Sequence, residues 1–335
     1  MSKSLRDVSF SVLDLAPIIE EGTPSDSLRN SLNLAQHAEQ WGYKRYWVAE
    51  HHSMPGIASS ATSVVIGYIA NGTKHIRVGS GGIMLPNHSP LVIAEQFGTL
   101  ESLFPGRIDL GLGRAPGTDQ LTARALRRGP EHYGQDFPEL LSELLGYFHP
   151  EEAALARGVR AVPGEGLDIP IWLLGSSDFS ARLASHMGFP FAFASHFAPN
   201  FTLPALEIYR KNFQPSEGLD KPYAMVGVNV VAADTEDEAR RLATSMQQQF
   251  LSLLRGRPGR LQPPVDNMDD MCTEYEKAAL AERNRFTVVG TADTVRTGLQ
   301  RILDQTDADE MIVSAQIYNH AARLRSYEIL SEVVK

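Results

Sequence analysis

Short apolar runs that alternate with longer segments of helical periodicity dominate this chain of 335 residues. Runs with the length and composition of buried strands lie at 8–15, 45–52, 76–85, 107–114, 169–174, 191–196, 224–232 and 311–317. Strands separated by helical segments are typical of parallel βαβ units. Eight such strands in one chain predict a (β/α)8 TIM barrel, an α/β fold.

Helical patterns follow most of these runs. We expect helices at 27–41, 59–71, 90–103, 139–148, 179–187, 203–212, 236–254, 294–305 and 321–334. An open doubly wound sheet is the alternative fold, and it normally carries a phosphate-binding Gly-x-Gly-x-x-Gly motif after its first strand. The first strand here ends in Asp14-Leu15-Ala16-Pro17, which lacks that motif, so the sequence favours the closed barrel.

Two stretches are too long for the loops of a minimal barrel. Residues 151–168 precede the fifth expected strand, and residues 256–285 precede the eighth. Loops of this length are usually functional or mobile. We therefore expect a single domain over 1–335, with 256–285 as an insertion that forms a lid over the barrel mouth.

Composition and charge argue against several kinds of partner. The formal net charge is −9 and no basic stripe stands out, which argues against nucleic acid. No uncharged apolar segment is long enough to cross a bilayer, and no signal peptide is recognisable. The single cysteine, Cys272, rules out an intrachain disulfide, and its acidic neighbours disfavour a thiolate nucleophile. We expect a cytoplasmic protein with neither nucleic acid nor membrane as its partner.

The second expected strand ends in Glu50-His51-His52, at the end of the barrel where active sites lie. Side chains alternate along a strand, so Glu50 and His52 should point one way and His51 the other. Adjacent histidines on a strand do not form the metal pair that His-x-x-x-His forms on a helix, so we expect no metal. Two interpretations stay open: a histidine used for hydrogen bonding or proton transfer, and a core histidine paired with Glu50.

The third expected strand contains Gly79-Ser80-Gly81-Gly82, a sequence that is unfavourable for a regular strand. Glycines inside a strand usually mark a bulge or a close approach by a ligand. Backbone without side chains would also let a flat aromatic ring lie against the strand. The sequence therefore predicts a ligand contact at Gly81 and Gly82.

Two other strand ends carry groups suited to an anion. The strand at 107–114 ends in a glycine-rich loop with Arg114, whose guanidinium can bind an anion as a fork. The fifth expected strand runs into Ser176, Ser177 and Ser180 at the start of a helix, and a helix N-terminus with hydroxyl donors can bind phosphate. A plain serine N-cap is the alternative for the serines. A structural ion pair with a nearby aspartate is the alternative for the arginine.

Several of these motifs, in this order, resemble the bacterial luciferase-like, flavin-dependent monooxygenases. The resemblance spans the chain from Val8 to the end and is carried by 49–52, 79–90, 106–118, 174–177, 289–291 and 308–313. The chain is most similar to the single-chain, FMN-type members rather than to the two-subunit, light-emitting enzymes. The resemblance implies a barrel that holds FMN at the C-terminal ends of its strands.

The resemblance also implies roles for individual residues. His51 matches the catalytic histidine of the family, which manages protons near the flavin. Gly81 and Gly82 match a non-proline cis peptide beside the flavin ring. Arg114, with Ser177 and Ser180, matches the contacts to the FMN phosphate.

Two positions depart from the light-emitting enzymes. Ser176 stands at the phosphate site where those enzymes have a glutamate, and Gly113 stands where they have a reactive cysteine. The missing cysteine should leave more room beside the flavin. It also weakens any inference about light emission or long-chain aldehydes.

The leading functional hypothesis is a monooxygenase that uses reduced FMN and O₂ on a small organic substrate. A separate NAD(P)H:flavin reductase would supply the reduced flavin, because the chain shows no nicotinamide-binding fingerprint. Three alternatives remain open: an F420-dependent hydride-transfer oxidoreductase of the same superfamily, a flavin-binding protein without turnover, and a barrel metallohydrolase.

We also expect a homodimer whose flat face is built by the second and third helices. The family resemblance supplies this expectation, and the segment 59–70 supports it because it is almost uncharged. An outer barrel helix normally has a charged face toward solvent. The alternative is that the segment 256–285 folds over this helix within one chain.

Overall fold

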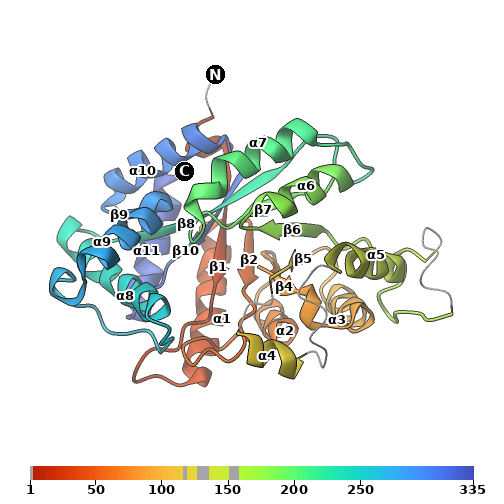
Figure 1. Ribbon diagram of the computed structural model, residues 1–335, viewed down its shortest axis with the longest axis horizontal. Coiled ribbons are helices and arrows are strands. Elements are labelled where there is room, and N and C mark those ends of the chain that lie inside the picture. Colours follow the sequence, from red (N-terminus) through yellow and green to blue (C-terminus); the bar gives the residue numbers. More distant parts are fainter. Residues whose placement is uncertain (1–2, 116–118, 127–135, 151–157) are drawn as a thin grey trace.

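The computed structural model describes residues 3–115, 119–126, 136–150 and 158–335. Eight parallel strands form a closed barrel, because β8 pairs with β10 at the end of the strand order β10-β1-β2-β3-β5-β6-β7-β8. The barrel strands are β1 (Ser9–Asp14), β2 (Arg45–Val48), β3 (Arg77–Ser80), β5 (Ile108–Gly113), β6 (Ile171–Gly175), β7 (Phe191–Phe193), β8 (Ala224–Ala232) and β10 (Glu310–Ser314). The predicted (β/α)8 barrel is confirmed (Figure 1).

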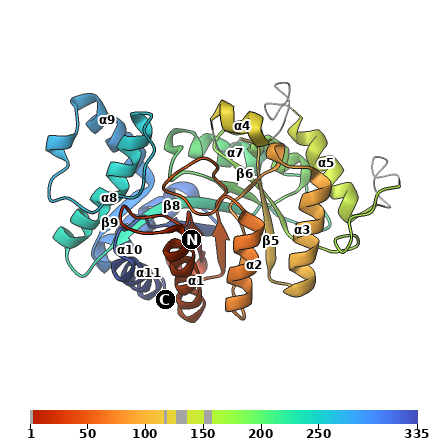
Figure 2. The same ribbon diagram turned by 90° about the horizontal axis from the view of Figure 1, so that it is seen from below.

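Helices surround the barrel on its outside (Figures 1 and 2). The α-helices are α1 (Pro24–Trp41), α2 (Thr62–Gly72), α3 (Pro90–Leu103), α4 (Gln120–Leu126), α5 (Phe137–Phe148), α6 (Asp178–Met187), α7 (Thr202–Asn212), α8 (Glu236–Leu254), α9 (Glu274–Arg283), α10 (Ala292–Thr306) and α11 (His320–Val333). Short 3₁₀ helices are η1 (Leu5–Asp7), η2 (Leu85–Asn87), η3 (Pro199–Phe201), η4 (Asp269–Met271) and η5 (Asn284–Phe286). Every helix range expected from the sequence is present, and the structure adds α4 directly after the loop of Arg114 and α9 within the insertion before β10.

The third expected strand is interrupted where the glycines predict a bulge. β3 ends at Ser80, and pairing with β5 resumes at β4 (Ile83–Met84) after a cis Gly81–Gly82 peptide. Across the gap the Ser80 hydroxyl donates to the Gly111 carbonyl at 2.8 Å and accepts from the Gly111 N–H at 2.9 Å. A Cβ on Gly82 would lie 2.8 Å from the Gly111 carbonyl oxygen, so the close approach that requires glycine there is made by the neighbouring strand.

A strand that the sequence did not predict, β9 (Thr287–Gly290), lies outside the closed barrel. The long strand β8 pairs with β10 from Met225 to Asn229 and with β9 from Asn229 to Ala232. The C-terminal part of β8 thus leaves the barrel wall and forms a second pairing. This extension places the insertion before β10 beside the barrel mouth.

A buried charged layer fills the N-terminal end of the barrel. The Arg45 guanidinium lies 2.8 Å from a carboxylate oxygen of Asp109 and 2.8 Å from one of Glu310, and both carboxylates are fully buried. Arg77 also pairs with Asp109, at 2.7 Å. Each buried charge therefore has an oppositely charged partner, as burial requires.

An apolar layer lies above the charged layer. It consists of Leu13, Trp47, Ala49, Trp172, Ala192, Met225 and Ile312. The two tryptophan rings meet edge to face at 5.2 Å between centroids, a favourable aromatic geometry. Several of these side chains form the floor of a cavity at the other end of the barrel.

The insertion before β10 is hydrogen-bonded to loops at the start of the chain. The Leu261 N–H donates to the Ile18 carbonyl at 2.9 Å, and the Glu20 N–H donates to the Leu261 carbonyl at 2.9 Å. The insertion then forms η4 and α9, which begins with a capping box between Thr273 and Glu276. Of the insertion before β6, residues 151–157 lie outside the described ranges.

The segment 256–285 does not cover α2, so that alternative is wrong. Val64 and Tyr68 on α2 are 71% and 43% exposed, and Val92 and Leu103 on α3 are also exposed. In both views α8 and α9 lie on one side of the barrel, away from α3 and α5 (Figures 1 and 2). Within the described ranges, no helix combines the length and apolarity needed to span a membrane.

Candidate active site

A cavity of about 410 Å³ opens at the C-terminal ends of the barrel strands. This is within the usual size range of small-molecule sites. Its lining contains every residue that the sequence proposed for the site: His51, Gly81, Gly82, Arg114, Ser176, Ser177 and Ser180. The strand ends therefore bring together groups that lie far apart in the sequence.

One part of the cavity has unpaired anion-binding groups. The Arg114 guanidinium lies 4.2 Å from the ring centroid of Phe179 and makes no ion pair with any described residue. Asp109 pairs instead with Arg45 and Arg77, and Asp119 accepts the backbone N–H groups at the start of α4. The alternative of a structural ion pair for Arg114 is therefore wrong for the described residues.

The serines that follow β6 lie beside this arginine in the cavity lining. Ser177 is the N-cap residue of α6, but its side chain makes no capping hydrogen bond, so the alternative of a plain serine N-cap is not what the structure has. The hydroxyls of Ser176, Ser177 and Ser180 form no hydrogen bond with another group in the described ranges. A cation, three hydroxyls and a helix N-terminus are thus available to one anion, which fits a phosphate monoester.

The floor beside this anion-binding end suits a flat aromatic ring. It is apolar, and it includes Leu13, Trp47, Ala192 and Ile312 together with the Gly81–Gly82 backbone. The expected free space beside Gly113 is not present, because a Cβ there would lie 2.7 Å from the sulfur of Met84. The Met84 thioether thus occupies the place where the sequence predicted extra room.

The side chains at the end of β2 alternate as predicted. His51 faces the cavity, whereas the His52 ring bonds to the Glu50 carboxylate at 2.8 Å. The Nδ1 atom of His51 is buried and has no hydrogen-bond partner among the described residues. Burial lowers the pKa of His51, although the nearby Glu50 opposes the shift. His51 is therefore a neutral imidazole at neutral pH, with Nε2 left to exchange hydrogen bonds with a bound molecule.

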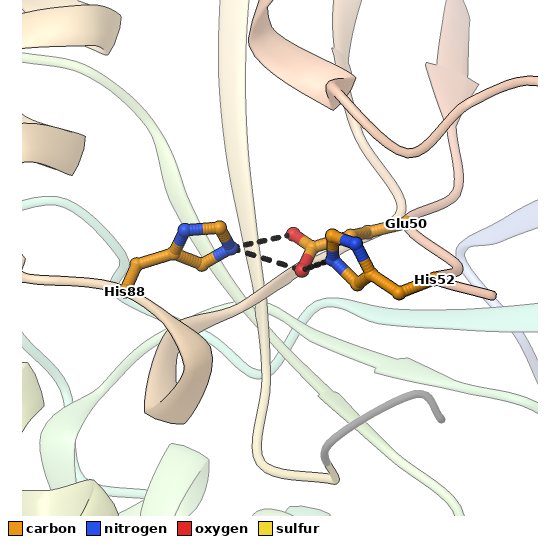
Figure 3. Close-up of side chains that lie close together, drawn as sticks. All are labelled: Glu50, His52 and His88. Atoms are coloured by element: carbon orange, nitrogen blue, oxygen red, sulfur yellow. Dashed lines mark hydrogen bonds and ion pairs between the residues drawn. The ribbon is translucent and has the colours of Figure 1, made fainter. Parts of the chain in front are cut away.

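Glu50 connects two histidines (Figure 3) and one backbone amide. Its carboxylate lies 2.8 Å from Nε2 of His52 and 2.9 Å from Nε2 of His88, and it accepts the Met84 N–H at 3.1 Å. Burial raises the pKa of Glu50, but these hydrogen bonds outweigh burial and lower it to about 2. The ionised carboxylate thus ties the end of β2, which carries His51, to β4.

The same three side chains have the composition of a metal site. One ligand atom from each of Glu50, His52 and His88 lies within 4.8 Å of the others. His88 follows a different strand from Glu50 and His52, so their spacing in the sequence does not connect the three. The observed distances are those of hydrogen bonds between a carboxylate and imidazoles.

His196, which follows β7, also lines the cavity. Its Nδ1 atom is buried without a hydrogen-bond partner among the described residues. Burial lowers the pKa of His196 to about 3, and the charges of Arg283 and His51 act in the same direction. His196 is therefore neutral over the whole physiological range.

Arg283, also in the cavity lining, was missed altogether. Thr273 and Glu276 show the spacing of a helix capping box, which could have predicted the start of α9. No local signal could have shown that the last residue of that helix points into the barrel mouth.

Comparison with known proteins gives consistent matches over the whole chain. A family model described as luciferase-like monooxygenase matches residues 8–310. A luciferase-like monooxygenase of Escherichia coli K12 is 54% identical over 328 residues, which cover 98% of this chain and 97% of that protein. An N-acetyl-S-alkylcysteine monooxygenase of Bacillus subtilis is 33% identical over 334 residues, which cover 98% of each chain.

Solved structures agree with these matches. Apo-MsnO8 is 35% identical, has a TM-score of 0.85, and is matched over 97% of this chain and 98% of its own. The oxygenating constituent of 3,6-diketocamphane monooxygenase from Pseudomonas putida, in complex with FMN, has a TM-score of 0.72 at 19% identity and is matched over 98% of this chain and 97% of its own. The second similarity is a similarity of fold.

Proposed function

Because the chain belongs to the luciferase-like monooxygenase family, we propose that it is a flavin-dependent monooxygenase that uses reduced FMN and O₂ on a small organic substrate. The observation that carries this proposal is the anion-binding end of the cavity. There Arg114 and three serine hydroxyls lack protein partners among the described residues and adjoin an apolar floor.

In this proposal Arg114, Ser177 and Ser180 bind the FMN phosphate, with Ser176 beside them. The apolar floor and the Gly81–Gly82 backbone hold the ring and keep water away from it. Reduced FMN supplies two electrons to O₂, so that one oxygen atom enters the substrate and the other leaves as water. The protein contributes binding, orientation and the handling of protons.

His51 is the residue that we assign to proton handling. Its lowered pKa keeps the ring neutral, and its Nε2 atom is the nitrogen that can donate to or accept from the bound reactants. Glu50 acts through the backbone: it ties Met84 and His88 to the end of β2 and so positions His51 without touching the reactants.

Three further expectations belong to this proposal. A separate NAD(P)H:flavin reductase supplies the reduced flavin, and O₂ is a co-substrate. The segment 256–285 covers the barrel mouth as part of one domain, supported by the hydrogen bonds of Leu261 to the loop after β1. The exposed apolar side chains of α2 and α3 form the face of a homodimer.

A binding experiment followed by a turnover experiment tests the function. The protein is titrated with FMN, riboflavin and F420, and FMN should bind most tightly. Chemically reduced FMN is then supplied in air with a panel of small organic compounds that includes N-acetyl-S-alkylcysteines. Oxygen-dependent product should form without any nicotinamide. Tighter binding of F420, or product formed without O₂, would favour hydride transfer instead.

A further inference from the structure

Arg283 lies in the lining of the same cavity. It is the last residue of α9 and reaches the cavity from the insertion before β10. Its guanidinium lies 4.5 Å from the ring centroid of Phe250 on α8. The phenylalanine ring is a favourable neighbour for the cation but supplies no hydrogen-bond acceptor.

The charge of Arg283 has no counterion among the residues that the structure describes. Its guanidinium forms no hydrogen bond or ion pair with any residue of the described ranges, although other arginines in or next to the insertion do. Arg255 binds Glu276 at 2.7 Å, and Arg285 binds Asn200 at 2.7 Å and Glu282 at 3.3 Å. Burial lowers the pKa of Arg283 to about 10, and no acidic group counteracts the shift. An unpaired, partly buried cation is unfavourable, which points to an anion supplied by a ligand.

The surroundings of Arg283 separate it from the phosphate-binding end. Arg114 follows β5 and stacks on Phe179 of α6, whereas Arg283 and Phe250 belong to α9 and α8. Helices α8 and α9 form one side of the molecule in both views (Figures 1 and 2). His196, which follows β7, lines the cavity together with Arg283 and His51, and the charge of Arg283 contributes to the lowered pKa of His196.

The wall around Arg283 is largely apolar, with Gln249 of α8 as a polar exception whose buried Oε1 has no partner among the described residues. Met246, Leu253 and Leu261 line the cavity with Phe250 on this side. A ligand that fits this wall therefore has an apolar body and one anionic group. A carboxylate is planar, and it can accept two parallel hydrogen bonds from a guanidinium fork.

We propose that Arg283 binds the carboxylate of the substrate, so that the enzyme acts on small carboxylic acids with an apolar body. The Arg283–carboxylate pair holds one end of the substrate beside His196, and the apolar part lies against Phe250 and toward His51. The assignment of this ligand as the substrate rests on the proposed function, whereas the existence of the anion site does not.

Equilibrium binding tests the site without turnover. Benzoate, 3-phenylpropionate and octanoate are titrated by calorimetry into wild-type protein, alongside their uncharged amides. At least one acid should bind more tightly than its amide, by about 10- to 100-fold, the range expected for a charge-assisted hydrogen bond. In Arg283→Gln this preference should disappear while amide binding stays unchanged.

Two control variants separate a binding role from a structural one. Arg285→Gln removes a nearby cation that faces Glu282 and Asn200, and it should keep the wild-type preference. Arg283→Lys keeps the charge without the fork, and it should restore part of the preference. The inference is overturned if no acid binds more tightly than its amide, or if Arg285→Gln loses the preference as fully as Arg283→Gln.

Titration with FMN distinguishes this inference from the proposed function. Arg283→Gln should bind FMN as tightly as the wild type, and a parallel loss of FMN affinity would make Arg283 a cofactor contact and overturn the inference. If wild-type protein binds no FMN but shows the Arg283-dependent preference, the proposed cofactor is wrong and the anion site stands.

Discussion

Arg114 and Arg283 line the same cavity, and each guanidinium stacks on a phenylalanine ring without an ion pair to any described residue. The buried Arg45 and Arg323, in contrast, are paired with carboxylates at 2.7–2.8 Å. Two cations in one cavity without a partner among the described residues form an arrangement suited to two anions. We assign one to the FMN phosphate and the other to the substrate.

Replacing Arg114 should distinguish FMN from riboflavin. Arg114→Ala removes a charge-assisted contact worth about 1.5–3 kcal/mol, so FMN should bind about 10- to 150-fold more weakly while riboflavin is little affected. Ser177→Ala should act in the same direction but more weakly, because a hydroxyl is a neutral donor. Flavin fluorescence titration measures both ligands.

Arg182→Ala is the matched control for Arg114→Ala, because Arg182 lies on α6 and pairs at the surface with Asp178. It should change neither affinity. Equal losses of FMN and riboflavin in Arg114→Ala would remove Arg114 from the phosphate site.

His51→Ala should slow turnover and leave FMN binding intact. General acid–base groups contribute about 10²- to 10⁴-fold, so kcat should fall by that factor. His186→Ala, at an exposed position of α6, is the control and should be silent. Wild-type turnover in His51→Ala would show that His51 has no part in the chemistry.

The buried neutral His196 predicts a loss of stability in acid. Its pKa is about 3 in the folded protein and near 6.5 in an unfolded chain, so protonation favours unfolding. The stability that depends on a neutral His196 is fully present above pH 6.5 and is lost as the pH falls toward 3. At pH 5 this loss lowers the free energy of unfolding by about 2 kcal/mol.

His196→Gln removes the group that titrates. Denaturant unfolding at several pH values measures the free energy of unfolding of the variant and of the wild type. The difference in unfolding free energy between pH 7 and pH 5 should be smaller in the variant than in the wild type by about 2 kcal/mol. The pKa values of His51 and His320 are also lowered chiefly by burial. These two residues should therefore preserve part of the pH dependence of the unfolding free energy in both proteins. Identical slopes would mean that His196 is not buried in its neutral form.

The proposed dimer is best tested at Val64. Gly67 of α2 is a poor test position because it packs against α3 within the same chain: a Cβ there would lie 3.3 Å from the Leu100 side chain. Val64 is 71% exposed, so Val64→Glu should shift a dimer toward monomer without disturbing the fold. Light scattering at micromolar concentration reports the mass, and a wild-type mass of one chain would contradict the dimer.

The sequence predicted the barrel well because buried parallel strands are short apolar runs that local composition reveals. It missed β9 because Thr287–Gly290 is short and pairs only with the end of β8. It placed His51, Arg114 and the serines in one site because parallel strands bring their C-terminal ends together. It could not connect Glu50 with His88, or place Arg283 in the cavity, because those contacts depend on how loops and an inserted helix pack.

The most direct test of the account follows the oxygen atoms. Wild-type protein is mixed with chemically reduced FMN, ¹⁸O₂ and the substrate panel, and the products are analysed by mass spectrometry. A carboxylic acid of the panel should gain one ¹⁸O atom, and the yield should fall in His51→Ala. A product without ¹⁸O, or conversion that proceeds with reduced F420 in the absence of O₂, would contradict the assignment as a monooxygenase.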